Sequence, residues 1–80
     1  MDIDATVSQL GELYRKQGRR GQDYVALLED FLTHLLEKDD DEFAITAIRK
    51  LLINEKAQFY PEEIKGWHFI SERWQHRLLG

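Results

Sequence analysis

The sequence of 80 residues contains no cysteine and a single proline. The absence of cysteine excludes a disulfide framework and a thiolate metal site, so packing alone has to stabilise the fold. No stretch approaches the ~18 consecutive apolar residues of a membrane span, and the acidic residues 1–4 do not resemble the basic start of a signal peptide. We therefore expect a cytoplasmic protein without a membrane segment.

Catalytic motifs are also missing from the sequence. There is no cysteine nucleophile, no serine within a glycine elbow, and no glycine-rich loop that could hold a phosphate. A chain of this length also has little interior in which to form a sheltered pocket. The sequence therefore predicts a protein that is not an enzyme and that uses no cofactor.

The composition is that of a compact helical chain, but its charge is unevenly distributed. Hydrophobic residues make up 42% and charged residues 32%, which is typical of a folded domain, so residues 1–80 are expected to form one domain. The net charge is −4, but residues 23–42 hold eight acids and one base, a net charge of −7, which leaves +3 for the remainder. This acidic segment can pair with the basic residues between positions 15 and 20, or can attract a basic partner.

Three amphipathic helices are predicted in the first two thirds of the chain. Apolar residues recur every three or four positions over residues 3–17, 23–38 and 41–56. Asp2 or Asp4 is expected to cap the first helix, Gly18 to end it, and an aspartate of the 39–41 run to cap the third. The second and third helices are expected to form a central antiparallel hairpin, and the first, with its narrower apolar stripe, to lie at the periphery.

A fourth helix is predicted over residues 61–79, because Pro61 and the two glutamates after it favour a helix start. At about 100° per residue, one arc of this helix is largely apolar. It contains Ile64, Trp67, Ile70, Ser71, Trp74 and Leu78. The predicted fold class is therefore all-α, a compact four-helix bundle-like domain. The apolar arc of residues 23–38 is wider than one neighbour requires, so a monomer and a homodimer both fit the pattern.

Phe69 falls outside the apolar arc of the fourth helix, on the side of Lys65, Arg73 and His76. Aromatic residues beside arginines are typical of the energetic centres of protein interfaces. Phe59 and Tyr60, just before the predicted helix, can extend this patch. The alternative is that Phe69 is a core residue in a bent or doubly flanked helix.

The main prediction is therefore a small protein–protein interaction module that acts as a regulator, adaptor or assembly factor. The alternative is a nucleic-acid-associated regulator that contacts phosphates through four basic residues of one turn. These are Arg15, Lys16, Arg19 and Arg20. The acidic net charge and the absence of a basic recognition helix weigh against this alternative.

Two rows of polar residues have the spacing of metal ligands on one side of a helix. His68, Glu72 and His76 form one, and Asp30, His34 and Glu37 form the other. Neither row contains the His-Glu-x-x-His pattern, and the acidic run of residues 37–42 lacks the glycine and the final glutamate of an EF-hand loop. Solvated helix faces explain the two rows, a hydrophilic turn that supplies an N-cap explains the acidic run, and no metal is predicted.

Overall fold

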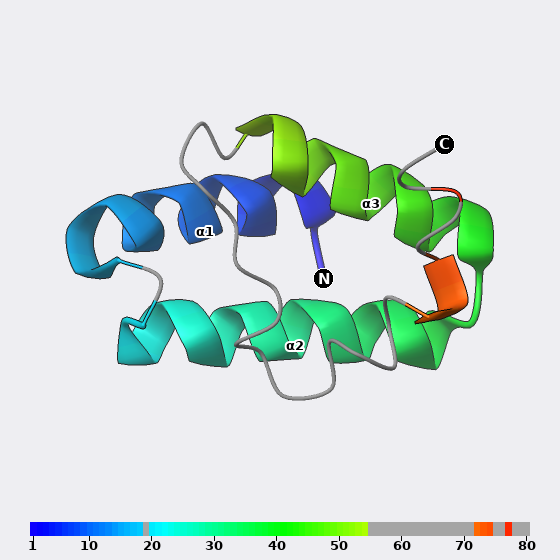
Figure 1. Cartoon of the computed structure of the whole chain (residues 1–80), viewed down its shortest axis with the longest axis horizontal. Helices are drawn as coiled ribbons and strands as arrows, with labels where there is room; N and C mark the ends of the chain where they lie inside the picture. Colours follow the sequence, from blue (N-terminus) through cyan, green and yellow to red (C-terminus); the bar gives the residue numbers. More distant parts are fainter. Residues whose placement is uncertain (19, 55–71, 75–76, 78–80) are drawn as a thin grey trace.

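The computed structural model describes residues 1–18, 20–54, 72–74 and 77. Within these residues the backbone is mostly helical and contains no strand, so the predicted all-α class is confirmed. Figure 1 shows three helices, α1 (Ile3–Gln17), α2 (Gln22–Lys38) and α3 (Asp41–Asn54). Residues 72–74 and 77 are also helical. The rest of the predicted fourth helix, and residues 55–56 of the predicted third, lie outside the described residues.

Both ends of α1 are stabilised by the residues that the sequence indicates. An Asp2 side-chain oxygen accepts a hydrogen bond from the Ala5 amide at 3.2 Å, and the Thr6 hydroxyl donates to the Asp2 carbonyl at 2.8 Å. After the last turn, the Gly18 amide donates to the Tyr14 carbonyl at 2.8 Å, and Gly18 has φ +80°. The predictions of Asp2 as a cap and Gly18 as the stop are confirmed.

The start of α2 is capped by a residue of the preceding helix. Gly21 occupies the N-cap position and has no side chain, so it cannot bond the free amides of the first turn. The Gln17 Oε1 atom accepts from the amides of Asp23 and Tyr24 at 3.2 and 3.4 Å, and Gln17 Nε2 donates to the Asp23 carboxylate at 2.8 Å. A Cβ atom on Gly21 would overlap with the Cβ of Gln17 as well as with its Oε1 atom, so a larger residue at position 21 conflicts with this cap.

The turn between α2 and α3 consists of aspartates with different roles. Asp39 ends α2 in the left-handed conformation at φ 53°, and its amide donates to the Leu36 carbonyl at 3.2 Å. Asp40 caps α3, because its Oδ1 atom accepts from the Phe43 amide at 3.1 Å. The predicted aspartate cap is thus confirmed and assigned to Asp40.

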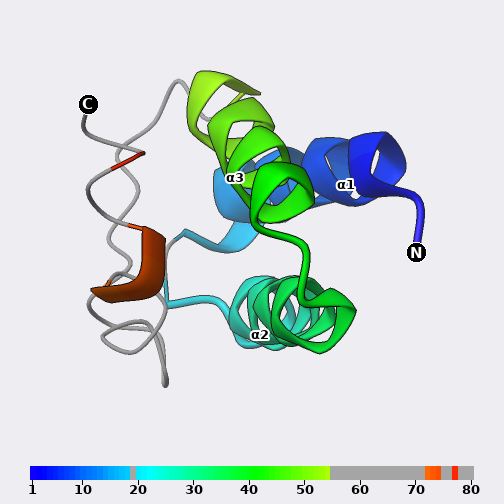
Figure 2. The same cartoon turned by 90° about the vertical axis from the view of Figure 1, so that its right-hand side faces the viewer.

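The three helices reverse direction one after another, and α1 and α3 lie on the same side of α2 (Figures 1 and 2). The prediction that α1 is peripheral is wrong, because α1 approaches both other helices more extensively than α2 and α3 approach each other. Its apolar stripe includes Val7 and Leu10, which are 5% and 0% exposed. A stripe of few residues is therefore sufficient to bury this helix against both neighbours.

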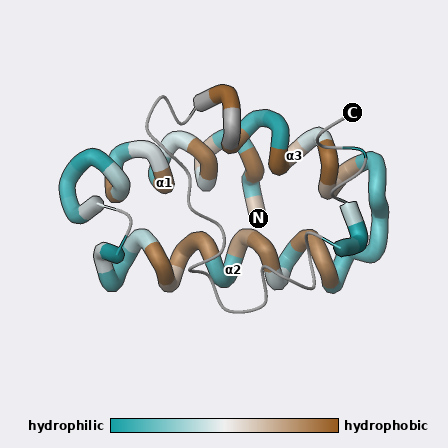
Figure 3. The backbone as a smooth tube through the Cα atoms, in the orientation of Figure 1, coloured by the Kyte–Doolittle hydropathy of each residue, from teal (hydrophilic) through white to brown (hydrophobic). Residues whose placement is uncertain are grey.

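Apolar residues recur along the helices, as Figure 3 shows, and among the described residues α2 and α3 each contribute five buried apolar side chains to the core. Those of α2 are Tyr24, Leu28, Phe31, Leu32 and Leu35. Val25 and Leu36, farther round the same helix, are half-buried against this core. The wide apolar arc is thus covered to a large extent within one chain. None of the described helices is long and apolar enough to cross a membrane.

Candidate functional site

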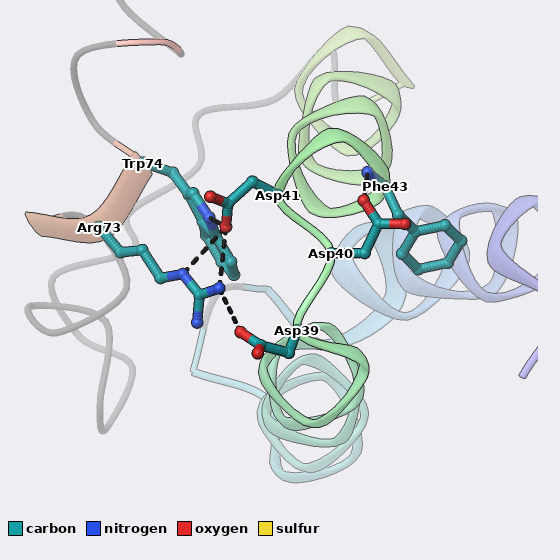
Figure 4. A network of polar contacts seen from close by, with 6 residues as sticks. All are labelled: Asp39, Asp40, Asp41, Phe43, Arg73 and Trp74. Atoms are coloured by element: carbon teal, nitrogen blue, oxygen red, sulfur yellow. Dashed lines mark hydrogen bonds and ion pairs between the residues drawn. The ribbon is translucent and has the colours of Figure 1, made fainter.

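Polar contacts join the α2–α3 turn to the C-terminal helical residues. The six participating side chains, which we call the clamp, are Asp39, Asp41, Glu42, Arg73, Trp74 and Arg77. The guanidinium of Arg73 lies between two carboxylates, with Nη2 2.6 Å from Asp39 and 2.9 Å from Asp41 (Figure 4). Its Nε atom also donates to Asp41 at 3.0 Å. Arg73 therefore holds both aspartates at once.

A second arginine extends the clamp along α3. Arg77 Nη2 lies 2.5 Å from Glu42, and the carbonyl of Arg77 accepts a hydrogen bond of 2.7 Å from Arg49. Asp40 takes no part, because its carboxylate points towards the Phe43 amide instead (Figure 4). The acidic turn thus has internal partners for Asp39, Asp41 and Glu42, and these partners come from the opposite end of the chain.

Trp74 connects the clamp to the core. Its side chain is 1% exposed and belongs to the same buried cluster as the apolar residues of the three helices. Its Nε1–H group donates to Asp41 Oδ1 at 2.8 Å, which satisfies the polar atom of an otherwise apolar ring. Trp74 is the one described apolar member of the arc predicted for the fourth helix, and it is buried.

Hydrogen bonds within the clamp shift the pKa values of Asp41 and Arg73. The hydrogen bond from Trp74, followed by that from Arg73, holds the pKa of Asp41 below its ordinary value of 3.8. The hydrogen bonds to Asp39 and Asp41 raise the pKa of Arg73. Both shifts favour the charged forms of Asp41 and Arg73.

The depressed pKa of Asp41 predicts a loss of stability in acid. A carboxylate whose pKa is lower in the folded than in the unfolded chain contributes stability above its unfolded value, and that stability is lost as the pH falls through the folded value. Wild type should therefore unfold at a higher temperature than Asp41→Asn at about pH 6, and the two should converge near about pH 2. Circular dichroism at 222 nm measures both midpoints. If the difference in unfolding temperature between the two proteins persists in acid, the charge of Asp41 is not responsible for it.

Most of the predicted partner-binding residues lie outside the described part of the chain. These are Phe59, Tyr60, Lys65, Phe69 and His76. Arg73 is described, and its guanidinium is engaged by Asp39 and Asp41. Its charge is therefore already matched within the molecule, and any partner would meet it as part of the clamp.

The basic turn is exposed where it is described. Arg15 and Lys16 lie in the last turn of α1, where positive charge interacts favourably with the helix dipole, and Arg20 precedes α2. Arg19 lies outside the described residues. The position of Arg15 and Lys16 thus has a structural explanation besides phosphate binding.

The predicted polar rows do not form a metal site where they are described. No group of His, Asp or Glu in the described ranges could hold a metal ion. His34 instead meets the ring of Phe43 edge-on, with centroids 6.2 Å apart, and Lys38 Nζ lies 4.4 Å from the same ring. In the other row, Glu72 is exposed, and His68 and His76 lie outside the described residues.

Comparisons with family models, curated proteins and solved structures gave no match. The chemistry of the chain therefore has to be inferred from its own residues. The sequence does not directly predict the clamp, but it contains a signal for it. Acids at positions 39, 41 and 42 are matched by arginines at 73 and 77, four residues apart on one side of a helix.

Proposed function

We propose that this protein is a small, non-enzymatic, cytoplasmic protein–protein interaction module that acts as a regulator, adaptor or assembly factor. In this proposal residues 1–80 form one four-helix domain, and the fourth helix, over residues 61–79, carries the binding surface. The observation that supports it best is the burial of Trp74, because this residue marks the inward side of the C-terminal helical segment.

The position of Trp74 orients the predicted patch. With about 100° between successive residues, Phe69 lies about 140° from Trp74 around a continuous helix, and Lys65 and His76 lie about 160–180° from it. If the side of Trp74 faces the core, the side of Phe69 faces away from it. An aromatic ring in that position has little structural purpose and fits the centre of an interface.

Arg73 is itself a member of the predicted patch, so in this proposal its contacts with Asp39 and Asp41 add polar chemistry to the binding surface. A partner would place an apolar side chain against Phe69 and polar groups against the clamp, which is the usual arrangement of apolar centre and polar rim. Affinity that depends on Phe69 should change little with ionic strength, because burial of apolar surface is not screened by salt.

The test is an affinity capture from native lysate with wild type and Phe69→Ala side by side, followed by mass spectrometry. We expect one protein to be retained by wild type after nuclease treatment and to be lost with Phe69→Ala. Ile53→Ala is the matched control, since Ile53 is 80% exposed and lies outside the patch. Phe69→Ala should also unfold cooperatively. Retention of the same protein by this variant, or its failure to fold, would refute the proposal.

The exposure of Arg15, Lys16 and Arg20 supports the second candidate function, a nucleic-acid-associated regulator. Four phosphate contacts at the basic turn would give an affinity that falls steeply with salt. The logarithm of the binding constant should fall by about 3 to 4 for each tenfold increase in salt concentration. Neutralising all four basic residues with glutamine should then abolish binding to a DNA or RNA duplex. If wild type binds neither duplex at low salt, this candidate is excluded.

A further inference from the structure

The C-terminal helical residues, Glu72–Trp74 and Arg77, are attached to the rest of the molecule in an unusual way. We call these four residues the strap. Among the described residues, Trp74 is the one buried apolar side chain that the strap contributes to the core. Its described polar attachments include the hydrogen bonds and ion pairs of the clamp and the bond from Arg49 to the Arg77 carbonyl.

The charged side chains of the clamp are accessible to solvent, unlike the core. The side chains of Asp39, Asp41 and Glu42 are 77%, 52% and 78% exposed, and that of Arg73 is 31% exposed. Exposed ion pairs weaken as salt screens them, whereas apolar burial between helices does not. The described contacts of the strap thus combine the apolar burial of Trp74 with ion pairs that salt weakens, whereas the three helices pack mainly through buried apolar side chains.

We infer that the strap is a releasable element, which opens by local unfolding while α1, α2 and α3 remain packed, and which the charge state around Asp39 and Asp41 controls. Opening withdraws the Trp74 ring from the core and frees both carboxylates together. A charged segment of a partner that places an arginine beside an aromatic ring would hold the open form, because it replaces both contacts of Arg73 and Trp74. The inference does not depend on whether Phe69 binds a partner.

Local opening is measurable in the wild-type chain by native-state hydrogen exchange. The Trp74 indole N–H is bonded to Asp41, so it exchanges only when the strap opens, whereas the Phe31 and Ile48 amides, deep in α2 and α3, report the opening of the helices. The Trp74 indole signal is assigned by comparison with the spectrum of Trp67→Phe. We expect the indole to exchange at least about 10-fold faster, relative to its intrinsic rate, than the two amides.

Salt should widen this difference. On going from about 0.05 M to about 0.5 M sodium chloride, indole exchange should accelerate a further 3-fold or so, while amide exchange stays constant. If the indole and the amides show equal protection and the same response to salt, the strap opens only with the whole molecule and the inference is wrong.

A double variant tests the role of the two carboxylates. Asp39→Asn with Asp41→Asn should expose the Trp74 indole to exchange and leave the Phe31 amide protected. The charge-matched control is Asp30→Asn with Glu37→Gln, two exposed acids of α2 outside the clamp, and it should leave both signals unchanged. An indole that stays protected in the double variant, or loss of Phe31 protection in parallel, would overturn the inference.

Discussion

Phe31→Ala is expected to lower the free energy of unfolding by about 3–5 kcal/mol, the usual cost of truncating a fully buried phenylalanine. Phe31 is 0% exposed and lies in the middle of the buried face of α2. The transfer free energy of the ring is lost, and the surrounding side chains can only partly fill the cavity. A chain of 80 residues has a total stability of about 4–12 kcal/mol, so the variant should be largely unfolded if the wild type is near the lower end.

Two further variants show whether this loss comes from the missing volume. Phe31→Leu keeps most of the buried volume and should cost less than about 2 kcal/mol. Thr33→Ala changes an exposed residue of the same helix and should stay within about 0.5 kcal/mol of wild type. Urea unfolding followed at 222 nm gives all three values. A loss below about 1 kcal/mol for Phe31→Ala would mean that α2 does not bury this face.

Gly18→Ala is expected to destabilise the fold by about 1–3 kcal/mol through the backbone alone. Gly18 has φ 80° and ψ 179°, a conformation that is essentially restricted to glycine. Apart from its two chain neighbours, no described residue would lie within 4 Å of a Cβ atom at this position, so the backbone conformation itself carries the cost. The cost arises because alanine has to adopt a strained backbone, or α1 has to end differently. Urea unfolding measures it.

Gly21 provides the contrast, because its restriction comes from a neighbour. A Cβ atom on Gly21 would overlap with the side chain of Gln17, which caps α2. The Gln17 atom nearest to that position is its own Cβ, so removing the whole side chain with Gln17→Gly should relieve the clash in a Gly21→Ala background, and the two substitutions together should cost less than the sum of each alone. Thr33→Ala, an exposed change farther along α2, should instead add to Gly21→Ala without coupling. Equal coupling in both pairs would contradict this assignment.

Features that depend on neighbouring residues could be predicted from the sequence. Asp2 as a cap, Gly18 as a stop and an aspartate cap for α3 all involve partners within four residues, where local chemistry decides the geometry. The helical ranges follow from apolar periodicity for the same reason. The inward position of Trp74 was also predictable, since the arc to which it belongs is apolar.

Features that depend on packing between distant residues could not be predicted in the same way. The central position of α1 arises because its apolar face packs against two helices at once. The periodicity of a sequence gives the width of such a face but not the number of helices that cover it. The Gln17 cap crosses a tight turn, whose geometry depends on two glycines. The residues of the clamp are 32 to 35 positions apart, so charge matching indicates that pairing can occur but not which carboxylate receives which arginine.

The separation of the clamp residues along the chain also has a consequence for the order of folding. Asp39 and Asp41 are synthesised more than thirty residues before Arg73, and the residues of α1, α2 and α3 precede the strap entirely. Contacts between helices that are neighbours in the chain are local and form quickly, whereas the contacts of Arg73 require a loop of more than thirty residues to close. The α1–α2 and α2–α3 pairs can therefore form while the aspartates of the turn are still unpaired. Arg73 and Trp74 then dock last, onto a surface that is already assembled.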